Sequence, residues 1–328
     1  MKACPDFFIA GNSKSGTTAL YHFLAQHQSI CMSNPKEPNF FAKDFLHGES
    51  VGAFTRRSWE EYSCCFAGAR PEQLLGEGSA CYLYSHAAAA SIFKANPDAK
   101  IIVIFREPVD FLFSYHLQML QNPVSEGETE KNFATALSLE ASRKQGDGLP
   151  AGCLVPQLLY YGERVKYAEQ LLRFKERFGS DQVRVYIYED FKADNEAVYG
   201  DVLDYLGLEH PRTPVTFETH NKSRKVRSKT AQNFAFNLSH GRGWYAPLHR
   251  AIKAVVPRSA RRVLTRSVYQ TVAFKPKPQI DEALKAKLKQ RFLPHVEAFS
   301  EVSGLDMVKR WGYAEIKTTQ PLRVSELM

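Results

Sequence analysis

Short apolar runs alternate with longer amphipathic segments along most of the first two thirds of the chain. The runs have the length of buried strands, and each is followed by apolar residues at helical spacing. This pattern predicts strands at 7–10, 101–105 and 183–188, and helices at 17–27, 109–121 and 195–206. Strands that alternate with helices are typical of a mainly parallel sheet covered on both faces. We therefore predict an α/β fold whose ligands bind beyond the carboxyl ends of the strands.

The length and composition indicate a folded protein. The chain has 328 residues, of which 44% are hydrophobic and 24% charged, and we interpret residues 1–328 as one large domain. The longest stretch without Asp, Glu, Lys or Arg has 21 residues, Ser15 to Pro35, but Ser, Thr, His, Gln and Asn interrupt it, whereas a membrane-spanning helix needs about 20 predominantly apolar residues. The first 12 residues lack the features of a secretory signal. We expect a cytoplasmic protein.

The charge is unevenly distributed. Lysine and arginine number 43 and aspartate and glutamate 35, which gives a net charge of +8. The interval 219–280 contains 14 of the basic residues and no acidic one. An excess of positive charge favours anionic partners such as nucleotides, nucleic acids, acidic glycans or membrane surfaces, and does not choose among them. The six cysteines show no CxxC pair and no zinc-ligand spacing, so we expect reduced, buried thiols and no metal site.

A glycine-rich loop joins the first predicted strand to the first helix. Its sequence, Gly11 to Thr18, has the Gly-x4-Gly spacing of a nucleotide phosphate loop. Backbone N–H groups at the start of the helix would point at a phosphate. Thr17 occupies the position of the lysine that reaches the β and γ phosphates of a nucleoside triphosphate, and Lys14 lies inside the loop instead. The loop suits a single phosphate better than a magnesium-bound triphosphate.

The run Lys14-Ser15-Gly16-Thr17-Thr18 resembles the 5′-phosphosulfate loop of the sulfotransferases that use 3′-phosphoadenosine 5′-phosphosulfate (PAPS). In that family the lysine contacts the 5′-phosphate and the oxygen that bridges to the sulfuryl group. The following serine and threonine residues hold the phosphate. The resemblance thus implies a P-loop-like sulfotransferase fold with helical elaborations. It also implies that Lys14 is both catalytic and cofactor-binding and that Ser15, Gly16, Thr17 and Thr18 bind the cofactor.

A second segment, which begins at Arg106 after the second predicted strand, is similar to the 3′-phosphate segment of the same family. There an arginine at a strand end is followed eight residues later by a serine, here Ser114. A guanidinium offers a planar fork of donors to phosphate oxygens, and Pro108 is suited to the first turn of a helix. The alternative for Arg106 alone is an ion pair at the end of the sheet. Two phosphate motifs on successive strand ends favour the cofactor role.

Between these motifs the sequence Pro35-Lys36-Glu37-Pro38-Asn39-Phe40-Phe41 resembles a segment of heparan-sulfate-type and bacterial carbohydrate sulfotransferases. Their glutamate takes the proton from the acceptor hydroxyl, whereas phenol and steroid sulfotransferases use a histidine. The resemblance implies that Glu37 is the catalytic general base. The alternative is a surface ion pair between Glu37 and Lys36 or another cation.

Three further segments resemble parts of the family. Gly76 to Leu83 is similar to a segment near the acceptor, and Glu77 in it is either an acceptor contact or a buried structural partner. Val185 to Phe191 resembles the strand that ends in Tyr-Glu-Asp, which implies cofactor binding by Tyr188, although an aromatic residue at a strand end is often part of the core. The segment after His220 corresponds to a basic loop over the 3′-phosphate, with Arg224, Lys225 and Arg227 as candidate contacts.

The basic interval 219–280 is expected to be a helical and loop elaboration near the cofactor and acceptor cleft. Its part 240–278 interleaves apolar residues with Lys and Arg, a pattern of amphipathic helices that contact a lipid or other anionic surface, or of a solvated basic face. The interval lacks the signatures of helix-turn-helix, zinc-finger or RNA-binding modules, so we expect no specific nucleic acid partner.

Taken together, the sequence predicts transfer of the sulfuryl group from PAPS to an acceptor hydroxyl of a glycan, lipid or small alcohol. The product would be adenosine 3′,5′-bisphosphate. An amine acceptor is the less favoured possibility, and no metal is expected. The alternative functions are a P-loop kinase or NTPase, a basic nucleic-acid-binding protein, and a scaffold that binds nucleotide without turnover. The missing lysine at position 17 argues against the kinase, and the presence of Glu37 and Lys14 argues against the inactive scaffold.

Overall fold

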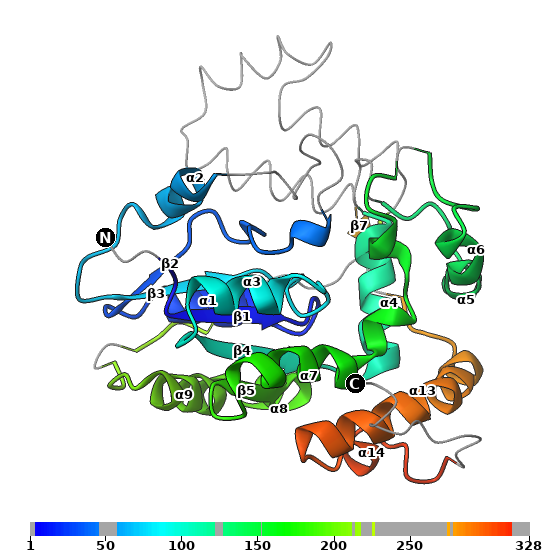
Figure 1. The fold of residues 1–328 in the computed structure, drawn as a ribbon. Coiled ribbons are helices and arrows are strands. Elements are labelled where there is room, and N and C mark those ends of the chain that lie inside the picture. Colours follow the sequence, from blue (N-terminus) through cyan, green and yellow to red (C-terminus); the bar gives the residue numbers. More distant parts are fainter. Residues whose placement is uncertain are drawn as a thin grey trace, which may run out of the picture.

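A five-stranded parallel sheet forms the centre of the protein (Figure 1). The computed structural model describes residues 4–45, 58–121, 127–151, 153–211, 214–217, 225–226, 274–275 and 278–316. The strands are β1 (Phe7–Gly11), β2 (Ile30–Met32), β3 (Leu74–Gly78), β4 (Lys100–Phe105) and β5 (Val183–Ile187), in the order β2-β3-β1-β4-β5. All neighbouring pairs run parallel, so the carboxyl ends of the strands share one edge. The predicted α/β class is confirmed.

Helices connect the strands and extend the fold. They are α1 (Thr17–Leu24), α2 (Trp59–Ser63), α3 (Ala88–Ala95), α4 (Pro108–Met119), α5 (Phe133–Ser138), α6 (Glu140–Lys144), α7 (Tyr167–Phe178), α8 (Tyr188–Ala193), α9 (Asn195–Leu206), α13 (Glu282–Ser303) and α14 (Met307–Arg310). Short 3₁₀ turns are η1 (Lys43–Phe45), η2 (Cys64–Phe66), η3 (Pro156–Leu159) and η4 (Glu163–Val165). β6 (Lys225–Val226) and β7 (Phe274–Lys275) form a separate antiparallel pair. Among the described helices, none combines the length and the apolar character needed to cross a membrane.

Helices cover both faces of the sheet, and successive strand residues point alternately into the two cores that result. Phe8 and Val103 point into one core, together with apolar side chains of α3, α4, α7 and α13. Phe7 and Ile102 point into the other, which α1, α8 and α9 cover. In Figure 1, α13 passes alongside α7 and α4, which it contacts. The near-continuous apolar runs in β1 and β4 follow from this two-sided burial.

The predicted strands and helices correspond to β1, β4 and β5 and to α1, α4 and α9, whereas β2 and β3 were not predicted as strands. β2 has only three residues, and β3 contains two glycines and a glutamate. Gly76 is required there by packing, since a Cβ atom would lie 2.2 Å from Cζ of Phe7 and 2.5 Å from Sδ of Met32. A strand with this composition lacks the apolar signal on which the prediction depends.

All six cysteines are free thiols. Cys65 is buried, but Cys64 is exposed and the other four are partly exposed. The expectation that all six would be buried was therefore wrong. Cys64 and Cys65 belong to η2, a single 3₁₀ turn in which two adjacent side chains cannot both face the core.

Candidate active site

The phosphate loop lies between the carboxyl end of β1 and the first turn of α1. Gly16 is the N-cap of α1 with φ 87°, and a Cβ atom there would lie 2.8 Å from the ring of Phe191. The loop thus needs glycine both for its left-handed backbone and for the approach of α8. The first turn of α1 contains no acidic residue, and no side chain caps it. Its N–H groups and helix dipole can therefore act on an anion without competition from a carboxylate in the turn itself.

Three strand-end loops meet at Arg106. A guanidinium nitrogen of Arg106, Nη1, donates to the carbonyl oxygen of Lys14 at 3.0 Å. The guanidinium carbon lies 4.6 Å from the centroid of the Tyr188 ring. The structure thus brings together predicted residues from the loops after β1, β4 and β5. Among the described residues, the buried Nε of Arg106 has no hydrogen-bond partner, so this donor is available to a ligand that offers acceptor oxygens.

The other residues of the two phosphate motifs follow from the same elements. Ser15 and Thr17 are buried in and just after the loop, and Thr18 is partly exposed on α1. Ser114 is buried on α4, the helix that begins two residues after Arg106. Tyr188 is the first residue of α8 rather than the end of a strand, because β5 stops at Ile187.

Tyr167 is hydrogen-bonded to the backbone of Arg106 and was not identified from the sequence. This buried tyrosine on α7 donates its hydroxyl to the carbonyl oxygen of Arg106 at 3.0 Å. Its ring packs 4.9 Å from that of Phe105. An aromatic residue on the apolar stripe of a helix is typical of the core, so the sequence carries no signal for this contact.

The segment with Glu37 is attached to the end of β3. The backbone N–H of Glu37 donates to the carbonyl oxygen of Gly78 at 3.2 Å, and that of Asn39 donates to Oγ of Ser79 at 3.1 Å. Glu37 and Asn39 have φ values of 59° and 54°, in the left-handed region. Since β3 pairs with β1, the segment lies at the same sheet edge as the phosphate loop.

The side chain of Glu37 faces solvent, with 47% of its area exposed. Its Oε1 lies 2.5 Å from Nζ of Lys36, which is the ion pair considered as the alternative. Exposure also leaves the carboxylate accessible to an incoming hydroxyl group. The structure thus shows the ion pair, and the role of Glu37 as base stays a prediction.

Glu77, in contrast, is completely buried beneath this segment. It accepts hydrogen bonds from the Tyr62 hydroxyl at 2.6 Å and the Ser79 hydroxyl at 2.5 Å. Burial raises the pKa of Glu77 to about 7, and the bonds from Ser79 and Tyr62 oppose this rise. Of the two interpretations of Glu77, the structure supports the buried structural partner. Through Ser79, Glu77 is linked to the backbone of Asn39 and so to the loop that carries Glu37.

The predicted contacts in the basic interval are mostly not described. Arg224 and Arg227 lie outside the described residues, and so does 240–278 apart from 274–275 and 278. The backbone of Lys225 lies in β6, opposite Lys275. Within the described part of the chain, no group of three or more His, Cys, Asp or Glu side chains could hold a metal ion.

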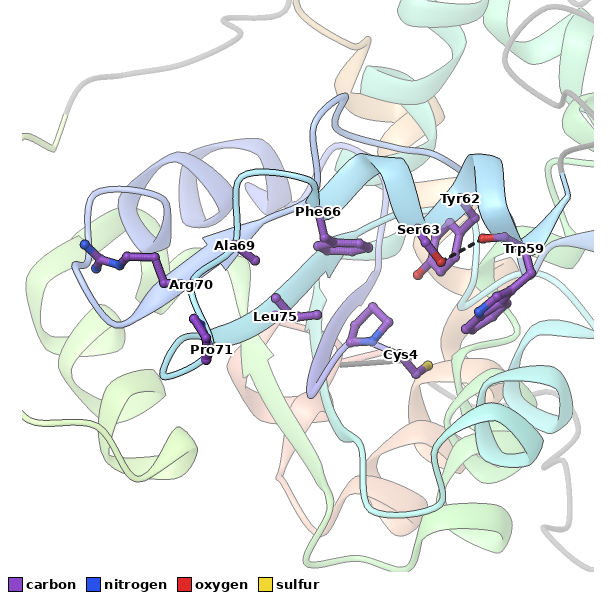
Figure 2. Close-up of a pocket in the computed structure, with 10 residues that line it drawn as sticks. Cys4, Trp59, Tyr62, Ser63, Phe66, Ala69, Arg70, Pro71 and Leu75 are labelled. Carbon is purple, nitrogen blue, oxygen red and sulfur yellow. Dashed lines mark hydrogen bonds between the residues drawn. The ribbon is translucent and has the colours of Figure 1, made fainter. Parts of the chain in front are cut away.

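A cavity of about 490 Å³ lies away from these residues, beside the start of β3 (Figure 2). Its lining includes Cys4, Trp59, Phe66 and Leu75, and Arg70 is the charged side chain among the lining residues. None of the predicted site residues that the structure describes lines it. The cavity is mainly apolar and is not the predicted phosphate site.

Comparison with known proteins identifies the family. A family model described as a sulfotransferase domain matches residues 4–241. The chain belongs to the sulfotransferase family. A sulfotransferase from Alicyclobacillus acidocaldarius has a similar structure, with a TM-score of 0.57 and 29% sequence identity, over 79% of this chain and 98% of that one. The range matched by the family model, 4–241, spans the positions of the predicted phosphate loop, Glu37, Arg106 and Tyr188.

Curated relatives of this sulfotransferase include heparan sulfate enzymes. The bifunctional heparan sulfate N-deacetylase/N-sulfotransferase 4 of Mus musculus is 28% identical over 211 residues, 62% of this chain and 22% of the relative. The human heparan sulfate glucosamine 3-O-sulfotransferase 5 is 26% identical over 129 residues, 39% of this chain and 35% of the relative. The chain spans about a quarter of the length of the bifunctional relatives.

Proposed function

We propose that this sulfotransferase transfers the sulfuryl group of PAPS to an acceptor hydroxyl, with Glu37 as general base. The observation that carries the proposal is the meeting of Lys14, Arg106 and Tyr188 at one edge of the sheet. PAPS is the donor that the family uses, and its two separate phosphate groups match two separate phosphate motifs. Thr17 stands where a kinase or NTPase would have its phosphate-binding lysine, which disfavours those alternatives.

The residues present are suited to this nucleotide. The unshielded start of α1 and the loop residues Lys14 to Thr18 would hold the 5′-phosphate side. Arg106, whose Nε has no partner in the part of the chain that the structure describes, and Ser114 would hold the 3′-phosphate, and Tyr188 would pack against the nucleotide. Arg224, Lys225 and Arg227 remain predicted contacts to the same phosphate. When bound, PAPS supplies the activated sulfuryl group and leaves as adenosine 3′,5′-bisphosphate.

Two side chains would act on the reaction itself. Glu37 accepts the proton of the acceptor hydroxyl at its exposed carboxylate, which makes the oxygen a better nucleophile. Lys36 competes for the same carboxylate and has to release it when the acceptor binds. The Lys14 ammonium group would neutralise negative charge on the departing phosphate, and such electrostatic stabilisation is a major part of group-transfer catalysis.

The acceptor is proposed to be a hydroxyl on a glycan, lipid or small alcohol. The names of the relatives include both N- and O-sulfotransferases of heparan sulfate, which supports a glycan among these classes. An amine acceptor is the competing outcome. The cytoplasmic location, the absence of a specific nucleic acid partner, the contact of 240–278 with an anionic surface and the single-domain interpretation of 1–328 stay predictions.

Calorimetric titration with adenosine 3′,5′-bisphosphate and with adenosine 5′-monophosphate tests the nucleotide assignment. We expect the bisphosphate to bind the wild-type protein more tightly. Arg106→Ala should weaken bisphosphate binding at least tenfold and change monophosphate binding little, because a charge-assisted bond to phosphate contributes about 1.5–3 kcal/mol. Absence of bisphosphate binding to the wild-type protein would overturn the proposed function.

A screen with labelled PAPS against glycans, lipids, small alcohols and amines tests the transfer step. With the best acceptor, Glu37→Gln should lower kcat by about 10²–10⁴-fold, the usual contribution of general base catalysis. Glu72→Gln, which removes another exposed carboxylate in an ion pair, is the matched control and should leave kcat unchanged. A Glu37→Gln variant with wild-type kcat would refute the assigned base.

A further inference from the structure

Two loops at the nucleotide edge are fastened by residues near the end of the described chain. The Tyr313 hydroxyl donates to Oε1 of Glu107 at 2.5 Å, and both residues are buried. The indole Nε1 of Trp311 donates to Oε2 of Glu189 at 3.1 Å. We refer to Trp311 and Tyr313 as the C-terminal clasp.

Each partner of the clasp is the immediate neighbour of a proposed nucleotide residue. Glu107 follows Arg106, and Glu189 follows Tyr188. The two glutamates also meet, since the backbone N–H of Glu107 donates to Oε1 of Glu189 at 3.4 Å. Through these two glutamates, the clasp fixes the backbone on either side of the contact between the Arg106 guanidinium and the Tyr188 ring.

The bond from Tyr313 also acts on helix α4. The second carboxylate oxygen of Glu107, Oε2, accepts the backbone N–H of Asp110 at 2.7 Å and so caps the helix that carries Ser114. Burial raises the pKa of Glu107, and the bond from Tyr313 is the main opposing influence. The Tyr313 hydroxyl thus helps to fix the orientation of the cap, and with it both residues of the 3′-phosphate motif.

The clasp itself is held rigidly. The Trp311 ring stacks on Phe299 of α13, with 5.6 Å between centroids and 11° between planes. Phe299 in turn lies 4.5 Å from the ring of Phe105, the residue before Arg106. Nζ of Lys289 donates to the Trp311 carbonyl oxygen at 2.7 Å. The clasp is thus anchored on α13 on one side and reaches the end of β4 on the other.

We propose that Trp311 and Tyr313 are positioning residues that set the preference of this enzyme for a nucleotide with a 3′-phosphate. Their side chains bond to Glu107 and Glu189, and thereby position Arg106 and the start of α4. The inference rests on the proposed function. It assigns a role to a segment beyond residues 4–241, the part that the family model matches.

The test compares two nucleotides in the full chain. Tyr313→Phe keeps the ring and removes the hydroxyl donor to Glu107. We expect its Kd for adenosine 3′,5′-bisphosphate to rise about fivefold, since one buried hydrogen bond contributes about 1 kcal/mol. The Kd for adenosine 5′-monophosphate, measured by displacement, should change less than about twofold. Trp311→Phe, which keeps an aromatic ring against Phe299, should shift the ratio of the two Kd values in the same direction.

Tyr186→Phe is the matched control. It removes a tyrosine–carboxylate bond of similar length, 2.6 Å to Asp201, on the opposite face of the sheet. It should leave the ratio of the two Kd values at the wild-type level. A clasp variant that keeps the wild-type ratio, or that loses both nucleotides equally, overturns the inference while the proposed function stands. A wild-type protein without preference for the bisphosphate overturns both.

Discussion

The buried carboxyl of Glu77 should make the stability of the protein fall as the pH rises from about 4.5 to about 7. Its pKa is raised from 4.5 to about 7 by burial in the folded protein. The folded state then binds a proton that the unfolded state has already lost between these two pH values. Stability from this group is therefore greatest below pH 4.5, decreases through the window, and is constant again above about pH 7.

The size of the effect follows from the two pKa values. The difference between 4.5 and about 7, at about 1.4 kcal/mol per pH unit, corresponds to about 3 kcal/mol. Between pH 5 and pH 8 most of this difference is passed, so a change of roughly 2–3 kcal/mol is expected. Because Glu77 is fully buried, solvent does not screen the penalty on its charged form.

Urea unfolding of the wild-type protein and Glu77→Gln at pH 5 and pH 8, at one ionic strength, isolates this contribution. Relative to Glu77→Gln, the wild-type free energy of unfolding should drop by about 2–3 kcal/mol between the two pH values. Tyr62→Phe provides a second variant. It removes a hydrogen bond that lowers the pKa of Glu77, so the pH window should move upward. A difference between wild type and Glu77→Gln that is the same at both pH values would refute the argument.

Two further predictions concern packing and charge. Glu128 and Arg143 form a completely buried pair with bonds of 2.7 and 2.8 Å, so Glu128→Gln should lower the free energy of unfolding by about 3–5 kcal/mol. The double variant Glu128→Gln/Arg143→Met should lose less free energy of unfolding than Glu128→Gln alone. A larger loss in the double variant would contradict this prediction. Gly16→Ala should weaken binding of adenosine 3′,5′-bisphosphate more than tenfold, because it adds both left-handed strain and a clash with Phe191. Gly146→Ala is the control, because Gly146 also has a positive φ but no described atom lies within 4 Å of the added Cβ. Its affinity for the bisphosphate, measured by calorimetry, should equal that of the wild type. Equal losses of affinity in the two variants would contradict the role of the clash with Phe191.

The sequence predicted those elements and site residues whose signal lies in a few consecutive residues. The apolar runs at β1 and β4 and the glycine loop before α1 are visible in consecutive residues, and the strand ends follow from them. The loop residues and Arg106 are indeed brought together. The buried bond between Glu107 and Tyr313 joins positions 206 residues apart, and no local pattern predicts such a pairing. The burial of Glu77 was one of two alternatives that the sequence left open, since its strand has little apolar character of its own.

The position of β1 between β3 and β4 places the proposed base and most of the proposed donor-binding residues on opposite sides of β1. The proposed donor-binding residues lie on the segments that follow β1, β4 and β5. Glu37 is attached through Gly78 to β3, on the other side of β1. A segment such as 34–41 could thus be exchanged for that of a relative without changing the loops that grip the nucleotide. Under the proposed function, chimeric enzymes built in this way should differ in their turnover of acceptors while their affinity for the nucleotide stays at the wild-type level. The strand order thus allows the segment that carries the proposed base to vary independently of the loops that bind the nucleotide.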